Sequence, residues 1–116
     1  MQEREQELIR NYLPMTEPGF LTLLFLQRPR HGYAIIQKVS QATNGRVVLS
    51  ASTVYTILYK MEQDGLIAFT GEEERRKVYR ITPAGHAVLL AETERLDAAL
   101  RLAVQVTETE GSEKDG

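Results

Sequence analysis

Residues 49–90 constrain the fold of this 116-residue chain more than any other segment, because they predict two capped helices joined by a pair of short strands. The first helix is predicted to begin after Ser50, whose hydroxyl can accept a hydrogen bond from a backbone N–H of the first turn. It is predicted to end at Gly65, since glycine readily adopts the left-handed conformation that follows a helix. The second helix is predicted to begin after Thr82, with Pro83 as its first residue.

The helix after Ser50 has one apolar face and one polar face. Apolar residues recur at positions i, i+3, i+4 and i+7, which places them on one stripe that should face a core. They are Val54, Ile57, Leu58 and Met61. The opposite face carries Ser52, Tyr55, Thr56, Tyr59 and Gln63. Such side chains exchange hydrogen bonds without adding negative charge, as a surface that meets phosphates and base edges requires. The alternative is an ordinary solvated face.

Two strands are predicted at residues 66–70 and 77–81, joined by a polar tip at residues 71–76 with Gly71 for the turn. Three cations at the tip, Arg75, Arg76 and Lys77, would reach phosphates from a stiff ribbon. Three carboxylates, at residues 72–74, stand beside them, and we expect these to point away from any bound duplex. A solvated hairpin tip is again the alternative.

Helix, hairpin and helix in this order predict a winged helix-turn-helix at residues 16–82, a mainly α fold with a small β-hairpin. Its most common use is to read duplex DNA. Residues 1–15 are predicted to form an N-terminal helical extension. Within the domain, one helix should follow the N-cap Thr16 and another should begin at Gly32 or Tyr33 and stop at Gly45. Residues 46–49 have strand-like composition.

The last predicted helix spans residues 83–106 and is long for so small a domain. Four of its residues are spaced by alternating steps of four and three, with Thr93 between the first two, which is close to the seam of a coiled coil. They are Leu89, Leu96, Leu100 and Ala103. We interpret this segment as a dimerisation helix; the alternative is that it folds back to complete the core of the monomer. Residues 107–116 are polar and acidic, and they predict a disordered tail.

Composition excludes several classes of function. The chain has no cysteine, which rules out a disulfide framework, thiol catalysis and cysteine-ligated zinc. Its two histidines, His31 and His86, lie far apart in the sequence, and no glycine-rich phosphate loop is present. We therefore predict no catalytic residues, no metal site, no cofactor and no enzymatic activity. The acidic N-terminus differs from a signal peptide, and the longest apolar run is too short for a bilayer, so a cytoplasmic protein is expected.

The charge is unevenly distributed along the chain. The net charge of −2 is unusual for a protein that binds nucleic acid. Residues 28–80, however, contain nine basic and five acidic residues, whereas the two flanks contain five basic and eleven acidic ones. A mildly basic segment thus lies between acidic ends, which suits a domain that contacts DNA only through its middle.

Short motifs spread over residues 16–100 resemble those of the PadR family of bacterial transcriptional regulators, in the shorter subfamily with a single C-terminal helix. They include Thr16-Glu17, His31-Gly32-Tyr33, Asn44-Gly45, Leu49-Ser50, Thr53-Val54-Tyr55, Leu58, Met61-Glu62, Asp64-Gly65-Leu66-Ile67, Arg75-Arg76-Lys77, Tyr79-Arg80-Ile81-Thr82 and Gly85. The resemblance implies a homodimeric repressor that binds a pseudo-palindromic operator and is released by a small molecule or a stress signal.

Carried over by position, the resemblance also implies the residues that meet DNA. On the helix they are Thr53, Tyr55 and Lys60, with Ser52, Thr56 and Tyr59 beside them; on the wing they are Arg75, Arg76 and Lys77. The sequence departs from the family in its acidic wing tip. It also has no tryptophan, and Leu96 stands where drug-sensing relatives have an aromatic residue, so drug binding is not carried over. The competing hypothesis is a winged helix that contacts another protein and not DNA.

Overall fold

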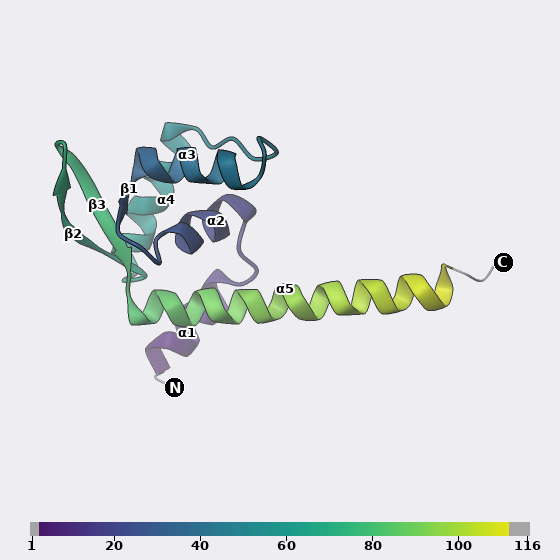
Figure 1. Ribbon diagram of the computed structural model, residues 1–116. Helices are drawn as coiled ribbons and strands as arrows, with labels where there is room; N and C mark the ends of the chain where they lie inside the picture. The colour runs from purple at the N-terminus through teal and green to yellow at the C-terminus, as the bar shows by residue number, and fades with distance from the viewer. Residues whose placement is uncertain (1–2, 112–116) are drawn as a thin grey trace.

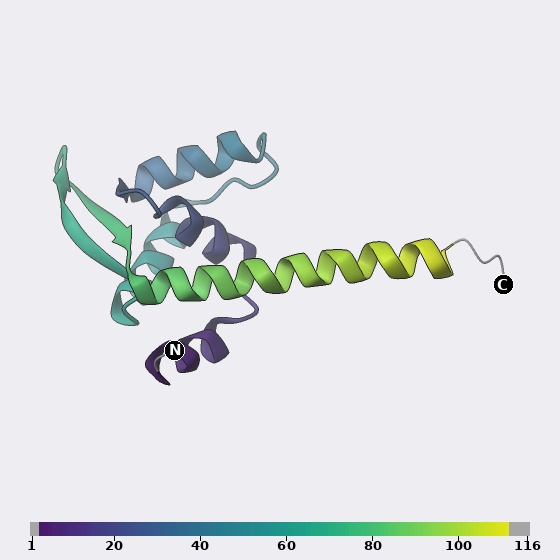
Figure 2. The ribbon, with the colours of Figure 1, turned by 60° about the horizontal axis from the view of Figure 1, so that its bottom comes forward.

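The computed structural model describes residues 3–111 and shows a small head from which one long helix extends (Figures 1 and 2). Over these residues there are five helices: α1 (Glu3–Tyr12), α2 (Glu17–Phe25), α3 (Gly32–Ala42), α4 (Ala51–Gln63) and α5 (Pro83–Glu110). Three strands form one antiparallel sheet: β1 (Arg30–His31), β2 (Ile67–Glu73) and β3 (Arg76–Ile81). The mainly α winged helix with a long C-terminal helix, as predicted, is confirmed.

Side-chain caps set the helix starts. Thr16, Ser50 and Thr82 precede α2, α4 and α5, and each hydroxyl accepts a hydrogen bond from the backbone N–H three residues further on. These three caps were predicted. For α3 the sequence left His31 as either a capping or a packed residue, and the structure shows the cap: its Nδ1 accepts from the backbone N–H of Ala34 at 3.1 Å, a role more often filled by Ser, Thr, Asp or Asn.

The hairpin of β2 and β3, called the wing below, has a tighter turn than predicted. Residues 71–73 belong to β2, and only Glu74 and Arg75 form the turn. Both have positive φ, 53° and 67°, as in the type I′ turns that suit the twist of paired strands. Gly71 is therefore not the turn residue. It lies at a bulge where the register shifts, and its φ of 153° explains why glycine is used there.

The strand-like segment at residues 46–49 is not a strand. It crosses the head as a loop, and its apolar residues Val47 and Leu49 pack into the core. The free edge of β3 is paired instead with β1, where Arg30 lies opposite Tyr79 and His31 opposite Val78. A strand of two residues has no detectable periodicity, so β1 could not be predicted from the sequence.

The core lies where the helices of the head meet the wing and the start of α5. Of the predicted apolar stripe on α4, Val54, Leu58 and Met61 are buried and Ile57 is partly buried. Tyr79 is buried beneath the wing, and Val88 closes the core from α5. The stripe therefore faces inward as predicted, which turns the polar side of α4 to the surface.

Helix α5 has a packed beginning and an exposed remainder. Leu89 and Glu92 are buried against the head, whereas every described residue from Thr93 onward is exposed. The helix runs to Glu110, so the prediction of disorder was wrong for residues 107–110. The rest of that predicted tail, residues 112–116, lies outside the described residues. No helix among residues 3–111 is long and apolar enough to span a membrane.

Candidate nucleic-acid interface

The polar face of α4 is open. Tyr59 is 68% exposed and Tyr55 49% exposed, even though both are large side chains. The other α4 residues that the sequence singled out are exposed as well: Ser52, Thr53, Thr56 and Lys60. A helix whose exposed outer face offers hydroxyls, rings and one ammonium group can enter a DNA groove.

Tyr55 stands at the edge of this face, where α4 crosses α3. A Cβ atom added to Gly32 would lie 2.8 Å from the Tyr55 ring, so the ring occupies the space that a side chain at position 32 would need. Gly32, the first residue of α3, thus makes room for the Tyr55 side chain of the candidate interface, a role that the sequence analysis missed. The sequence feature that could have indicated this role is a glycine at a helix start, where a stronger helix former would be expected.

Lys60 stands at the opposite edge and is already paired. Its Nζ lies 2.7 Å from Asp64 Oδ2, and the Tyr12 hydroxyl donates to the same oxygen at 2.6 Å. The hydrogen bond from Lys60, aided by the one from Tyr12, holds the pKa of Asp64 below its usual range. Burial, with Asp64 beside it, raises the pKa of Tyr12. The positive charge of Lys60 is therefore partly neutralised at the surface.

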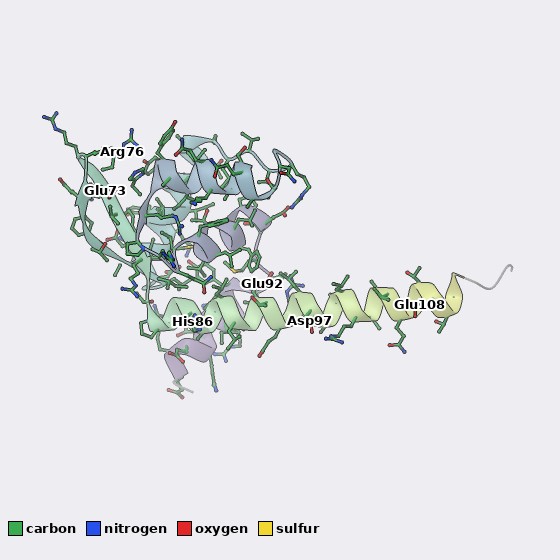
Figure 3. All side chains as sticks on the ribbon, in the orientation of Figure 1. Glu73, Arg76, His86, Glu92, Asp97 and Glu108 are labelled. Carbon is green, nitrogen blue, oxygen red and sulfur yellow. The ribbon has the colours of Figure 1, made fainter. Side chains whose placement is uncertain are left out.

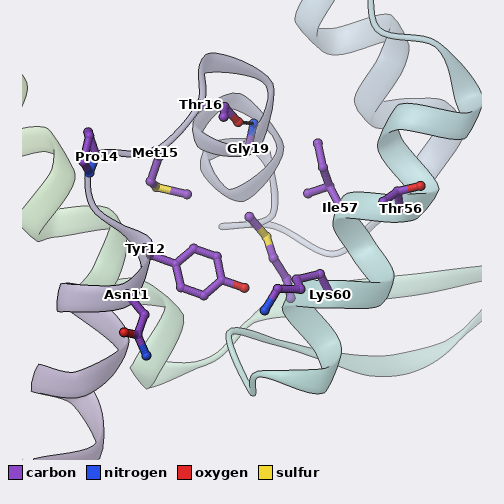
Figure 4. A pocket seen from close by; sticks show the side chains of 10 residues that line it. Asn11, Tyr12, Pro14, Met15, Thr16, Gly19, Thr56, Ile57 and Lys60 are labelled. Carbon is purple, nitrogen blue, oxygen red and sulfur yellow. Dashed lines mark hydrogen bonds between the residues drawn. The ribbon is translucent and has the colours of Figure 1, made fainter.

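A hollow of about 330 Å³ opens beside Lys60, between α4 and the linker that joins α1 to α2 (Figure 4). Its lining is mostly apolar, with the thioethers of Met15 and Met61, the Tyr12 ring and Ile57 as its main surfaces. Thr56, from the exposed face of α4, borders the same hollow. A molecule held there would touch the helix that the sequence assigned to DNA.

The wing cations line a second hollow, of about 550 Å³, with the outer face of α4. Its lining consists of Tyr55, Leu58, Tyr59, Glu62, Arg75, Arg76, Lys77 and Tyr79. All three predicted wing cations are exposed and lie close to the two tyrosines of α4. Glu62 also borders this hollow and adds a carboxylate that the sequence analysis did not consider. The structure thus brings Tyr55 and Tyr59 together with the three wing cations. Ser52, Thr53 and Thr56 instead border Thr16 and Pro18 at the start of α2.

The proposed seam on α5 is divided by the structure. Leu96, Leu100 and Ala103 are exposed, the two leucines at 39% and 63%. Leu89, by contrast, is 4% exposed and packs in the core of its own chain, so it is not available to a partner. The heptad spacing did not show that Leu89 lies in the part of α5 that packs on the head.

A family model described as the Transcriptional regulator PadR-like family matches residues 20–91, from α2 into the first turns of α5. The chain belongs to this PadR-like family. It is also 32% identical over 87 residues, 72% of this chain and 76% of the relative, to an uncharacterized protein of Lysinibacillus sphaericus. The family resemblance drawn from the sequence motifs is therefore confirmed.

Solved structures share the fold of this PadR-like chain. A transcriptional regulator from Clostridium thermocellum superposes with a TM-score of 0.68 at 23% identity, over 90% of this chain and 96% of that one. A PadR family transcriptional regulator from Eggerthella lenta gives 0.60 at 24% identity, over 94% and 89%. Membership of this family makes the chain a DNA-binding transcriptional regulator.

Proposed function

We propose that this PadR-like chain is a repressor that binds a pseudo-palindromic operator as a homodimer and is released by a small molecule or a stress signal. The single observation that carries the proposal is the exposed polar face of α4, with the wing cations beside its Tyr55 and Tyr59. Each copy would read one half-site, with α4 in the major groove and the wing along the backbone.

On α4, the residues proposed to meet DNA are Ser52, Thr53, Tyr55, Thr56, Tyr59 and Lys60; on the wing they are Arg75, Arg76 and Lys77. Ser52, Thr56 and Tyr59 lie at the centre of the exposed face and suit base edges. Lys60, which shares Asp64 with Tyr12, suits a phosphate at the edge of the groove. The wing cations suit phosphates, since long cationic side chains follow a backbone without reading its sequence.

The second copy would pair along the exposed part of α5. Leu96, Leu100 and Ala103 share one side of that helix, and about four turns of it extend beyond the head with apolar side chains in water. A long apolar seam of this kind is normally covered by another helix. A two-fold pair would repeat the reading face, as a pseudo-palindromic operator requires.

Release would follow if a bound molecule moved α4. The hollow of about 330 Å³ that borders Thr56 and Lys60 offers a place from which a small molecule would contact α4 directly. A ligand acts in this way only if it prefers the state of the protein that does not bind DNA. The proposal therefore predicts that an inducer and the operator weaken each other's binding by the same factor.

Selection of bound sequences from a random duplex pool tests the proposal. We expect a two-fold motif whose half-sites are about one helical turn apart. Binding should also weaken steeply with salt, because each phosphate contact releases counterions. An enriched motif without symmetry would contradict the dimer. A failure to enrich any sequence, together with a salt-insensitive protein partner, would instead favour a winged helix used for protein contact.

A further inference from the structure

The wing carries opposite charges that face each other across its two strands. Glu72 lies opposite Lys77, and Glu73 lies opposite Arg76. Directly opposed residues of antiparallel strands have neighbouring side chains, and opposite charges at such positions usually attract each other. A wing neutralised in this way would have little positive charge left for a phosphate.

The side chains do not pair across the strands. Among residues 3–111, none of the ion pairs joins a wing glutamate to a wing cation; the carboxylate of Glu73 instead lies 3.9 Å from Nε2 of His31. Arg76 lies over the ring of Tyr33, with its Cζ 4.9 Å from the ring centroid, on the side of the wing that faces α3 (Figure 3). Lys77 lies over Phe69 at 5.9 Å.

His31 is held in place through its backbone and through one nitrogen of its ring. Its backbone is paired with Val78 of β3, and its Nδ1 accepts the capping hydrogen bond from Ala34. Because Nδ1 is an acceptor, a neutral ring carries its proton on Nε2, the atom that faces Glu73. The imidazole also stacks on Tyr33, with ring centroids 6.5 Å apart and planes 16° from parallel. The neighbouring rings of His31 and Tyr33 thus each contact one of the two opposed wing residues, His31 contacting Glu73 and Tyr33 contacting Arg76.

We propose that His31 and Tyr33 are positioning residues for the wing: His31 draws Glu73 away, and the Tyr33 ring holds Arg76, so that Arg76 meets a DNA phosphate without a carboxylate partner. The inference rests on the proposed function, in which Arg76 contacts phosphate. An aromatic face suits this task, because it attracts a guanidinium group while leaving its N–H donors free at the rim.

The first test measures binding of a fluorescent nonspecific duplex over a series of salt concentrations. Arg76→Gln should reduce the slope of log K against log salt by about 0.9, as expected for one lost phosphate contact. Tyr33→Leu should weaken binding about two- to five-fold, the range of an exposed cation–π contact, whereas Tyr33→Phe keeps the ring and should bind as the wild type does. Adding Tyr33→Leu to Arg76→Gln should change nothing further.

The second test asks whether His31 controls Glu73. His31→Asn keeps a capping side chain but removes the group that faces Glu73, so it should weaken binding. Glu73→Gln should then strengthen binding more in the His31→Asn background than in the wild type. Glu72→Gln, a matched control on the same strand, should give the same gain in both backgrounds. His86→Asn, on the exposed side of α5, should leave binding unchanged.

The outcomes separate this inference from the function on which it rests. A wild type that does not bind the duplex would overturn both. An Arg76→Gln variant with an unchanged salt slope would overturn this inference alone, because Arg76 would then contact no phosphate. If Arg76→Gln behaves as expected but Tyr33→Leu weakens binding independently of it, or Tyr33→Phe binds as poorly as Tyr33→Leu, only the positioning role fails. In the free protein, NMR should show a ring-current shift of the Arg76 δ protons that Tyr33→Leu removes and Tyr33→Phe preserves.

Discussion

Two buried glycines, Gly32 and Gly85, differ in what a methyl group would meet. At Gly32 it would meet the outer end of the half-exposed Tyr55 side chain, which can move aside. At Gly85 it would meet the backbone carbonyl of Leu66, which is fixed by its hydrogen bond from Thr82. The first glycine therefore belongs to the interface and the second to the packing of α5 on the head.

We predict that Gly32→Ala weakens DNA binding while changing the free energy of unfolding by less than about 1 kcal/mol, because alanine favours the helix as the Tyr55 ring is displaced. Gly85→Ala should instead lower the free energy of unfolding by about 3 kcal/mol, as overpacking against a backbone atom does. Urea denaturation and fluorescence anisotropy measure the two effects. Equal losses of stability in both variants would contradict this assignment of Gly32.

Glu92 is a buried carboxylate, with a side chain only 2% exposed, whose two oxygens accept from Arg95 at 2.8 Å (Figure 3). Those hydrogen bonds lower the pKa of Glu92 from its ordinary value of 4.5. As the pH falls below about 4.5, the unfolded chain therefore takes up a proton that the folded chain does not, and stability is lost.

Glu92→Gln should accordingly be less stable than the wild type by about 2 kcal/mol at neutral pH, since it loses charged hydrogen bonds. Its melting temperature should also fall less steeply than that of the wild type between pH 5 and about pH 3. Melting curves over this range check both expectations. Asp97→Asn, an exposed carboxylate further along α5, is the control and should leave the acid profile as it is.

At the level of elements, the parts with strong local chemistry were predictable. Ser50, Thr82 and Gly65 fixed the ends of α4 and the start of α5, because a cap or a left-handed residue acts within one turn. The two-residue β1 and the loop at residues 46–49 were not predictable. Which segment pairs with β3 depends on tertiary contacts between parts of the chain that are far apart in the sequence. The bulge at Gly71 depends likewise on the pairing of β2 with β3.

In the predicted interface, too, features set by the local sequence were predictable and features set by tertiary contacts were not. Periodicity identified the exposed face of α4 with Ser52, Tyr55, Thr56 and Tyr59, whereas Thr53 and Lys60 were assigned to DNA only through the resemblance to the PadR family. It could not show that Lys60 shares Asp64 with Tyr12, which is 52 residues away in the sequence, or that Tyr55 leans on Gly32. Leu89 followed the heptad spacing of α5 and yet is buried in the head, because spacing does not show where a domain ends.

The acidic wing provides a prediction at this scale. Changing Glu72, Glu73 and Glu74 together to glutamine should tighten nonspecific DNA binding several-fold at low salt, because three carboxylates near the phosphate backbone repel it. The gain should shrink as salt is raised. Changing Glu3, Glu5 and Glu7 of α1 to glutamine removes the same charge at a distance from the wing, and should have a smaller effect. Equal gains would mean that the wing tip does not approach DNA.

For the whole molecule, the proposed dimer depends on the exposed part of α5. Replacing Leu96 and Leu100 together by aspartate should convert dimers to monomers that bind a palindrome poorly, since charges on an apolar seam prevent helix pairing. Leu90 and Leu102 are exposed leucines away from that seam, and the same double replacement there should leave the dimer intact. Sedimentation velocity distinguishes the two. A wild type that sediments as a monomer would rule out the dimer.

Thr82 links the end of α4 to the start of α5. Its hydroxyl caps α5 and donates to the carbonyl of Gly65 at 2.6 Å, directly after α4 ends, and its N–H donates to Leu66. In a dimer, each α4 would therefore move together with the α5 helix of its own chain. The number of base pairs between the operator half-sites would then depend on the angle at which the two α5 helices cross. Selection of bound DNA sequences alone could therefore detect a change in that angle.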